Sequence, residues 1–481
     1  MLASQVSEPP MVPPGPTARD VTGDQSAEEE LHFLRDPMRR LPVEVINLIS
    51  EKFVLTAGLP LLLGWVCRDW RFVSWNSPSL WANIRFGLPP TNEWYLTLRY
   101  KEHLEMAFQW LERSRSLPLH IEIYCPINSH GGRNGWEPVS LERGLLTLLK
   151  KFAGRWRIFV LSFAKDDRIG IFFGTDEYFA APMLEKLRIE LVPEDEYGSL
   201  EEDEPHFFLP GCSPSLMDLG DVDLSLISIN WRNLTRLSFY FCNNFGPDEL
   251  IDLLESAPNL EICQVRGTSR LERTPDDPVI RNHFFTHSKL HTLALIVDEE
   301  SSRQPFGRLF SLVNFPSLRT LKYAYREAPK NVQIPMLRKF IPFAFKTATS
   351  LANLYLRSIT AVPHSTNFFV VLLQAMNNLQ TLAICHCSGF ISDFFFEQFE
   401  GGRFLPSLRI FKYVGSRSFS WTFFKKMLQR MDAPPQGVAT VSVNLNKQLS
   451  GCQLTTIYNS CANAVYTFRT NSKWMNLSGR D

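Results

Sequence analysis

Three histidines spaced four residues apart are the residues of this chain that come nearest to a metal site. His283, His287 and His291 would lie on one face of a continuous helix, where their imidazoles could bind Zn²⁺. Residues 290–295, however, have the apolar pattern of a strand, so a helix cannot continue through His291. The sequence therefore predicts no zinc site here.

Cys385, His386 and Cys387 are the second candidate for a metal site. Adjacent residues at the end of a strand point to opposite faces, so these three cannot converge on one tetrahedral ion. The chain also lacks a Gly-rich phosphate loop and the His-Glu-x-x-His and Gly-x-Ser-x-Gly motifs. We therefore expect no catalytic residue, no cofactor and no metal.

A repeated apolar pattern occupies most of the chain. Each copy has an apolar residue, two variable residues, a second apolar residue, one variable residue and a third apolar residue. Clear copies recur at intervals of 26 to 33 residues and begin at Leu234, Leu260, Leu290, Leu318, Leu351, Leu379 and Leu408. This period is typical of leucine-rich repeats, in which each unit buries its apolar face only by stacking on its neighbours.

Earlier copies of the pattern are less regular. Copies begin at Ile158 and Leu184, and a copy at Leu216 is degenerate because Asp221 falls where an inward apolar residue belongs. Residues 102–115, 141–152, 249–256 and 368–376 have helical patterns, and 117–124 alternates like a strand.

The predicted fold is α/β: an irregular solenoid with parallel strands on its concave side and helices on its convex side. Phe368–Phe369 and Phe394–Phe396 are expected to pack in its core rather than to line a ligand pocket.

The segment before the repeats predicts three short helices in residues 41–86. Pro42 suits the first turn of a helix, and Val45, Ile46, Ile49 and Phe53 follow at helical spacing. Gly58 and Pro60 end this helix, and further apolar residues follow in 61–73. A unit of this size has a small core, so it is expected to be stabilised by packing against a neighbouring domain or a partner.

Three elements of this segment resemble the F-box, in the F-box-like variant widespread in fungi. They are Leu41, Pro42, Glu44, Val45 and Ile46; then Val66, Cys67, Arg68, Trp70 and Arg71; then Pro78, Leu80 and Trp81. The resemblance extends to 110–114, 117–119 and 155–157, and so spans most of 41–415. Ser50 departs from it, because the family usually has a Phe there, and the change removes an apolar contact from the expected interface.

The resemblance implies a non-enzymatic substrate-recognition subunit of a Skp–cullin–F-box ubiquitin ligase. The F-box would bind the Skp adaptor and, through it, the cullin, while the repeats would bind a target protein. The implied adaptor-binding residues are Leu41, Pro42, Val45, Ile46, Ile49, Val66 and Trp70. Alternatives are a helical cap with no partner, a repeat scaffold with a degenerate F-box, and a hydrolase or transferase in an irregular α/β domain.

Composition sets the expected domains and compartment. Residues 1–38 are rich in Pro, Ser, Glu and Asp and are predicted to be disordered; they are followed by an F-box-like domain (39–86), a connector and N-terminal cap (87–155), the solenoid (156–432) and a C-terminal cap or tail (433–481). The acidic stretch 193–205 is predicted to be a solvated loop.

The 50 basic and 50 acidic residues give no net charge, which argues against binding to nucleic acid or membranes. No secretory signal or membrane-spanning segment is visible, and nine scattered cysteines favour a reducing cytoplasmic or nuclear location.

A candidate target-binding surface follows from the strand pattern. Residues flanking the inward apolar positions point to the concave face, and there basic residues outnumber acidic ones, with Glu190 as the only acidic member. We expect an acidic or phosphorylated target segment to bind this face. The residues are Arg188, Arg236, Tyr240, Arg266, Lys322, Tyr355, Arg357 and Lys412, with Lys186 beside them.

Overall fold

The computed structural model divides into two compact units, residues 1–81 and 82–481, which are described separately. It describes 41–42, 44–46, 48–50, 52, 60–87, 100–124, 139–164, 180–192, 207–209, 211–220, 222, 224, 227–242, 247–268, 284–297, 307–325, 343, 346–359, 365–387, 389–400, 403–415, 419–431, 440–445, 465–470 and 473–478. The predicted leader 1–38 and acidic loop 193–205 lie outside the described residues. No described helix has the length and apolar character needed to cross a membrane.

The first unit is helical over most of its described residues. Residues 44–46, 48–50 and 52 are helical, and α3 (Pro60–Val66), α4 (Arg68–Asn76) and α5 (Pro78–Trp81) follow. Arg71 Nε donates to the Gly64 carbonyl at 2.8 Å, which ties α4 to α3. Trp81 is buried and its Nε1 donates to the Ser74 carbonyl at 2.7 Å, which ties α5 to α4. These bonds give short helices a defined packing that their small core alone would hardly supply.

The second unit is built on a 15-stranded sheet whose neighbours are parallel except for the last pair, β18 and β19. The strands in spatial order are β1 (Asn83–Gly87), β2 (Leu119–Tyr124), β3 (Trp156–Ala164), β4 (Lys186–Val192), β6 (Leu216–Gly220), β8 (Arg236–Cys242), β9 (Ile262–Thr268), β11 (Thr292–Val297), β13 (Thr320–Tyr325), β14 (Asn353–Arg357), β15 (Thr381–Cys385), β16 (Ile410–Gly415), β17 (Thr440–Leu445), β18 (Val465–Thr470) and β19 (Lys473–Ser478).

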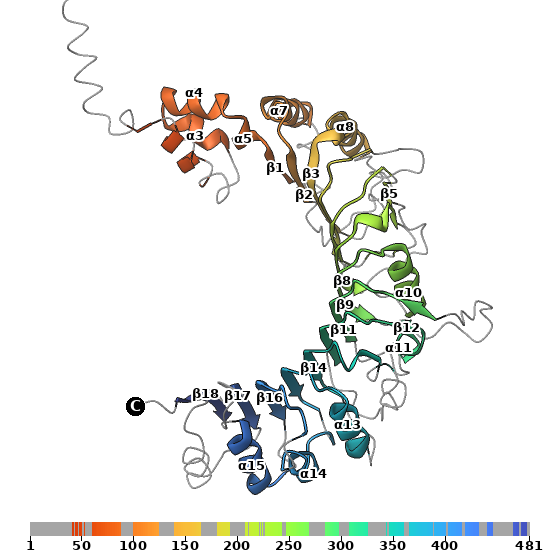
Figure 1. The fold of residues 1–481 in the computed structure, drawn as a ribbon. Helices are drawn as coiled ribbons and strands as arrows, with labels where there is room; N and C mark the ends of the chain where they lie inside the picture. Colours follow the sequence, from red (N-terminus) through yellow and green to blue (C-terminus); the bar gives the residue numbers. More distant parts are fainter. Residues whose placement is uncertain are drawn as a thin grey trace, which may run out of the picture. The chain divides into compact units, whose positions relative to one another are not determined.

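Helices cover one face of this sheet and leave the other open (Figure 1). They are α7 (Tyr100–Arg113), α8 (Val139–Lys151), α10 (Pro247–Ser256), α11 (Gly307–Leu312), α13 (Ser365–Gln374), α14 (Asp393–Glu397) and α15 (Trp421–Met431), with 3₁₀ turns at Ala153–Arg155 and Trp231–Asn233. Two small sheets, β5 (Phe207–Phe208) with β7 (Ile227–Ser228) and β10 (Phe285–Thr286) with β12 (Val313–Asn314), complete the unit. The predicted α/β class, with parallel strands and helices on opposite sides, is confirmed. We call the uncovered side the open face.

The repeat pattern explains the core. In eight copies the first, fourth and sixth residues are buried; these copies begin at Leu184, Leu234, Leu260, Leu290, Leu318, Leu351, Leu379 and Leu408. The fourth and sixth residues lie on a strand and share its inward face, because side chains alternate along a strand. Backbone bonds then link successive units: His291 N donates to Glu261 O at 2.8 Å, and Arg319 N to His291 O at 2.9 Å.

Two of the predicted copies are displaced by two residues. The copy placed at Ile158 begins at the buried Trp156, and Ile158 itself is only half-buried. The copy placed at Leu216 begins at buried Pro214; Met217 and Leu219 point inward and Leu216 is 36% exposed. Trp and Pro replace the usual leading leucine in these copies. A search for leucine at the first position therefore placed the start of each copy, and so its frame, two residues too late. The Leu216 copy is therefore a regular unit.

The domain limits also differ from those expected. The structure divides after Trp81 rather than after residue 86, because β1 pairs with β2 and belongs to the sheet. The segment predicted as a connector, 87–155, supplies β2, α7 and α8 to the same unit, so the sheet begins well before residue 156. Its far end extends into the predicted tail, where β17, β18 and β19 continue the sheet.

Aromatic side chains fill the space between the strands and the helices at the C-terminal end. Phe395 lies against Phe369, Phe404 and Phe411, with ring centroids 5.6–6.4 Å apart. Phe395 and Phe369 are fully buried, as expected of core residues. Their neighbours in sequence differ: Phe368 is 51% and Phe394 is 41% exposed. The prediction of core packing is thus confirmed for Phe369, Phe395 and Phe396, but not for the other two.

His287 joins two repeats through a buried turn. Its Nδ1 accepts from Leu290 N at 3.2 Å, and its Nε2 lies 3.0 Å from the Ala257 carbonyl, so the neutral ring with a proton on Nε2 satisfies both contacts. Burial lowers the pKa of His287. The imidazole is therefore a structural group of the second unit.

We predict a pH-dependent contribution of His287 to stability. The folded state favours the neutral ring, so this contribution is complete above the ordinary histidine pKa of about 6.5 and is lost as pH falls below it, where the unfolded state takes up the proton. Chemical unfolding from pH about 7.5 to about 5.5 should show His287→Gln less stable than wild type at the higher pH, with the gap narrowing on acidification. Ser288→Ala, in the same turn, should follow the wild-type curve. Parallel curves for wild type and His287→Gln would contradict the prediction.

Candidate functional site

The residues considered first as metal ligands do not converge. His283 lies outside the described residues, His287 is held by backbone groups, and β11 begins immediately after His291, so no helix passes through it. Cys387 Sγ donates to the Cys385 carbonyl at 3.3 Å, and burial raises the pKa of Cys387 to about 12. Within the described part of the chain, no three Cys, His, Asp or Glu side chains lie close enough to hold a metal ion.

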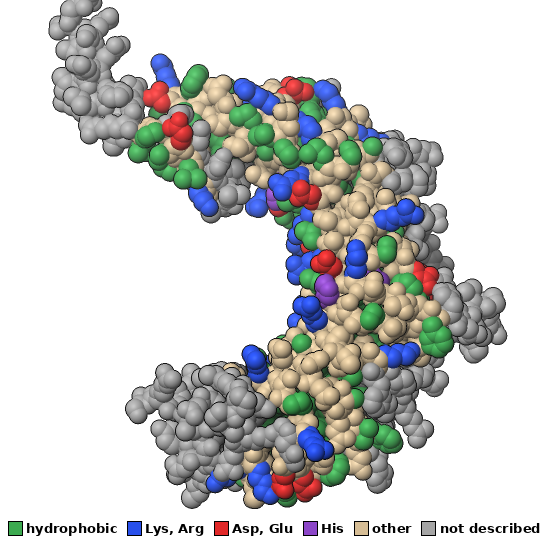
Figure 2. All heavy atoms as spheres, viewed as in Figure 1, with side chains coloured by type: hydrophobic (Ala, Val, Ile, Leu, Met, Phe, Trp, Pro, Cys, Tyr) green, Lys and Arg blue, Asp and Glu red, His purple; other side chains and the backbone are tan. Residues whose placement is uncertain are grey.

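The first unit carries large apolar side chains that solvent reaches. Val45, Leu48 and Ile49 are 38%, 57% and 40% exposed, and their spacing places them on one side of the first helix. Figure 2 shows hydrophobic side chains gathered on this unit. We call the following set the apolar helical surface: Val45, Leu48, Ile49, Trp65, Val66, Phe72 and Trp75.

The implied adaptor-binding residues divide between this surface and the interior. Val45, Ile49 and Val66 belong to it, and Pro42 is also exposed, whereas Leu41, Ile46 and Trp70 are half-buried. Four members were missed: Leu48, Trp65, Phe72 and Trp75. The spacing of Leu48 three residues after Val45 could have identified it.

Ser50 differs from its expected role. It is only 1% exposed, so it points into the first unit rather than toward solvent. A serine at this position therefore removes no side chain from the apolar helical surface. The effect of Ser50 on adaptor binding stays a prediction, and because the residue is buried any such effect would act through packing within the unit.

All eight predicted target-binding residues lie on the open face. Strand registers place them in three rows that cross the sheet, so that Tyr240 pairs with Arg266, and Lys322 pairs with Tyr355. The six basic members are exposed, and the two tyrosines are half-buried. Figure 2 shows the blue Lys and Arg side chains along this side of the sheet. Alternation of side chains along each strand was sufficient to predict this placement.

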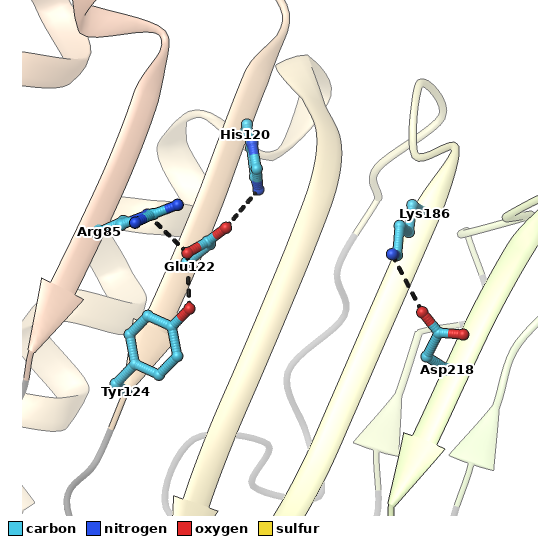
Figure 3. A network of polar contacts seen from close by, with 6 residues as sticks. All are labelled: Arg85, His120, Glu122, Tyr124, Lys186 and Asp218. Carbon is cyan, nitrogen blue, oxygen red and sulfur yellow. Dashed lines mark hydrogen bonds and ion pairs between the residues drawn. The ribbon is translucent and has the colours of Figure 1, made fainter. Parts of the chain in front are cut away.

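A buried acid organises the first part of the open face. Glu122 is 9% exposed and accepts from Arg85 Nε at 2.8 Å, His120 Nε2 at 2.9 Å and Tyr124 Oη at 2.7 Å (Figure 3). The bond to Glu122 raises the pKa of Tyr124, while burial, the largest effect, lowers the pKa of His120. A neutral His120 can still donate its Nε2 proton, so the cluster stays hydrogen-bonded at neutral pH.

Further ion pairs neutralise the neighbouring strands. Lys186 Nζ lies 3.1 Å from Asp218 Oδ2, and Arg188 Nη2 lies 2.7 Å from Glu190 Oε2. Glu190 is therefore not the only acid on this face, and Arg188, predicted to bind the target, already has an acidic partner. Asp218 was missed although the alternation along its strand places it on this face. We call the open face of β1, β2, β3, β4 and β6 the paired sector.

The open face of β8, β9, β11, β13, β14, β15 and β16 has a different charge. It presents five cations, and no Asp or Glu occupies an outward position of these seven described strands. Two of the cations lie over tyrosine rings: Arg266 Cζ is 5.2 Å from the Tyr240 centroid, and Lys322 Nζ is 5.4 Å from the Tyr355 centroid. We call this region the basic sector. Its cations are Arg236, Arg266, Lys322, Arg357 and Lys412.

Comparison with known proteins does not place this chain in a family. Neither the protein-family models nor the curated proteins searched contain a match to this sequence. Any function must therefore be argued from the residues themselves and from their arrangement.

The Glu122 cluster should contribute measurably to folding. Glu122→Ala leaves Arg85, His120 and Tyr124 without their shared acceptor, and we expect a loss of about 1–3 kcal/mol in the free energy of unfolding. Glu190→Ala is the control, because its exposed pair with Arg188 should contribute only about 0–1 kcal/mol. Urea unfolding followed by circular dichroism measures both. Equal losses of unfolding free energy in the two variants would show that the Glu122 cluster stabilises the fold no more than an exposed ion pair does.

Proposed function

We propose that this protein is a substrate-recognition subunit of a Skp–cullin–F-box type ubiquitin ligase. The observation that carries the proposal is the exposure of the apolar helical surface at and around the positions of the F-box-like motif. Val45, Ile49 and Val66 belong both to the motif-implied set and to this surface. The Skp adaptor is the partner that the resemblance implies for them, and the cullin would join through the adaptor.

Energetics favour a partner for this surface. Fully burying a side chain the size of valine, leucine or phenylalanine gains about 1.5–3 kcal/mol relative to leaving it exposed. Trp65, Phe72 and Val66 are each more than 60% exposed, so a partner could gain much of this energy. Large apolar side chains clustered on one small unit are typical of a protein-binding surface.

The second unit supplies a surface for the target. Its open face is polar and charged along rows that cross many strands, which suits recognition of a protein segment. Catalysis would come from the conjugating enzyme of the ligase, and this chain would act by raising the effective concentration of a target lysine near it. No catalytic side chain, cofactor or metal is required of this chain for that role.

Adaptor binding is tested by placing acids on the apolar helical surface. Val45→Asp with Ile49→Asp should abolish co-purification with a Skp adaptor, because both side chains are exposed and each charge would have to be desolvated in the interface. The matched control is Val371→Asp with Phe368→Asp on α13, where 50% and 51% exposed apolar residues take the same charges. Undiminished capture by the first variant would refute the F-box assignment. Failure of the wild-type chain to bind any Skp adaptor would favour the alternative of a repeat scaffold.

The two units should separate at the observed boundary. A fragment of residues 82–481 keeps β1 in the sheet and should fold and lack adaptor affinity. A fragment starting at residue 93 loses β1, exposes the edge of β2 and removes the buried Ile84, so it should unfold at a lower temperature. Circular dichroism melts and adaptor pull-downs of both fragments measure this. Full adaptor binding by the 82–481 fragment would place the docking surface in the second unit.

A further inference from the structure

The basic sector differs from the paired sector in how its cations are balanced. On the paired sector, Lys186, Arg188 and Arg85 have carboxylates within 3.1 Å. On the basic sector, the outward positions of the described strands hold cations, tyrosines and small or neutral residues only. A ligand with negative charge would therefore meet uncompensated cations on β8 to β16 and compensated ones on β1 to β6.

The cations of the basic sector are spread across the strands rather than along one strand. Arg236 lies on β8 and Lys412 on β16, six strand spacings away, or about 29 Å at ~4.8 Å per spacing. Arg266, Lys322 and Arg357 lie on strands between them. An extended peptide at about 3.3 Å per residue would need roughly nine residues to pass over all five.

The arrangement around β15 suits a single anionic group. Arg357 on β14 pairs in register with Cys385, and Lys412 on β16 pairs with Ala383. Ala383 is 3% exposed and Cys385 is half-buried, so two short side chains lie between two long cations whose strands are about 10 Å apart. Burial raises the pKa of the Cys385 thiol, and the charges of Lys412 and Arg357 oppose this.

We propose that the basic sector binds an extended acidic segment of a protein, crossing the strands from β8 to β16, with one carboxylate or phosphate held between Arg357 and Lys412 above Ala383 and Cys385. The guanidinium of Arg357 can form paired hydrogen bonds to either anion, and Lys412 adds a point charge from the other side. This inference deepens the proposed function, since the acidic segment would belong to the target protein.

The tyrosines favour a peptide over a single-stranded nucleic acid. Binding of bases without sequence preference relies on open aromatic faces on which they stack. Arg266 lies over the ring of Tyr240 and Lys322 over that of Tyr355, so each ring already has a cation on one face. Both tyrosines are also half-buried among their neighbours on the sheet. The sector therefore offers charges at intervals, as an acidic peptide requires.

Fluorescence anisotropy with synthetic peptides tests the proposal on the full chain. The probes are twelve-residue peptides of Gly and Ser that carry either five Glu residues, or four Glu and one central phosphoserine. Arg357→Ala with Lys412→Ala should weaken both peptides about tenfold or more. Lys186→Ala with Arg188→Ala removes the same charge from the same face and should change the affinity less than about twofold, because those cations are paired. Binding should also weaken as salt rises.

The two peptides separate the sources of the anion. Tighter binding of the phosphoserine peptide, with the difference lost in Arg357→Ala/Lys412→Ala, assigns the position above β15 to phosphate; equal binding assigns it to carboxylate. Equal losses in the two double variants, or no binding of either peptide by wild type, would overturn the proposal. So would tighter binding of a twelve-nucleotide thymidine strand than of either peptide. Unfolding midpoints of both variants should match wild type, because all four side chains are exposed or half-buried.

The outcome is independent of the adaptor test. Peptide binding with no Skp capture would leave the acidic-segment site standing and remove the ligase function. Skp capture with no peptide binding would do the reverse.

Discussion

The structure depends on one constraint: no repeat can satisfy its own backbone or bury its own apolar stripe. The strand of each unit has hydrogen-bond partners only on the strands before and after it, and its three inward residues are covered only when helices and neighbouring units close over them. Backbone bonds such as Gln380 N to Ala352 O at 2.7 Å repeat this link from unit to unit. Stability is therefore shared along the whole sheet, which explains why β1 and β17 to β19 belong to it.

This constraint leaves the open face free to vary. Because inward positions must be apolar, every second strand residue is released from packing and can carry charge. The chain uses this freedom in two ways. Near the N-terminal end, Glu122, Asp218 and Glu190 each take a basic partner, so that part of the face is balanced internally. From β8 to β16 no Asp or Glu occupies an outward position of the described strands, so the positive charge of this part of the face is available to a ligand.

The first unit differs from the open face in that it exposes large apolar side chains rather than charged ones. Its interior is small, with Leu63, Leu80 and Trp81 among the buried residues, and much of its apolar surface remains outside. Ser50 is buried, whereas the larger side chains of Leu48 and Phe72 are exposed to solvent. In the function that we propose, a partner of the first unit would gain free energy through apolar burial, and a partner of the second unit through charge.

The leucine spacing by itself determined the α/β class, the parallel strands, the inward residues of eight repeats and the placement of all eight predicted target-binding residues on one face, because these follow from local periodicity. Only the tertiary structure decided the frames beginning at Trp156 and Pro214, since a shift of two residues keeps the same alternation along the strand. It also decided which cations meet a partner on a neighbouring strand: Lys186 meets Asp218, whereas Arg357 and Lys412 flank short side chains. Those neighbours are set by the register of strands about thirty residues apart, which depends on how the units stack and not on any local pattern.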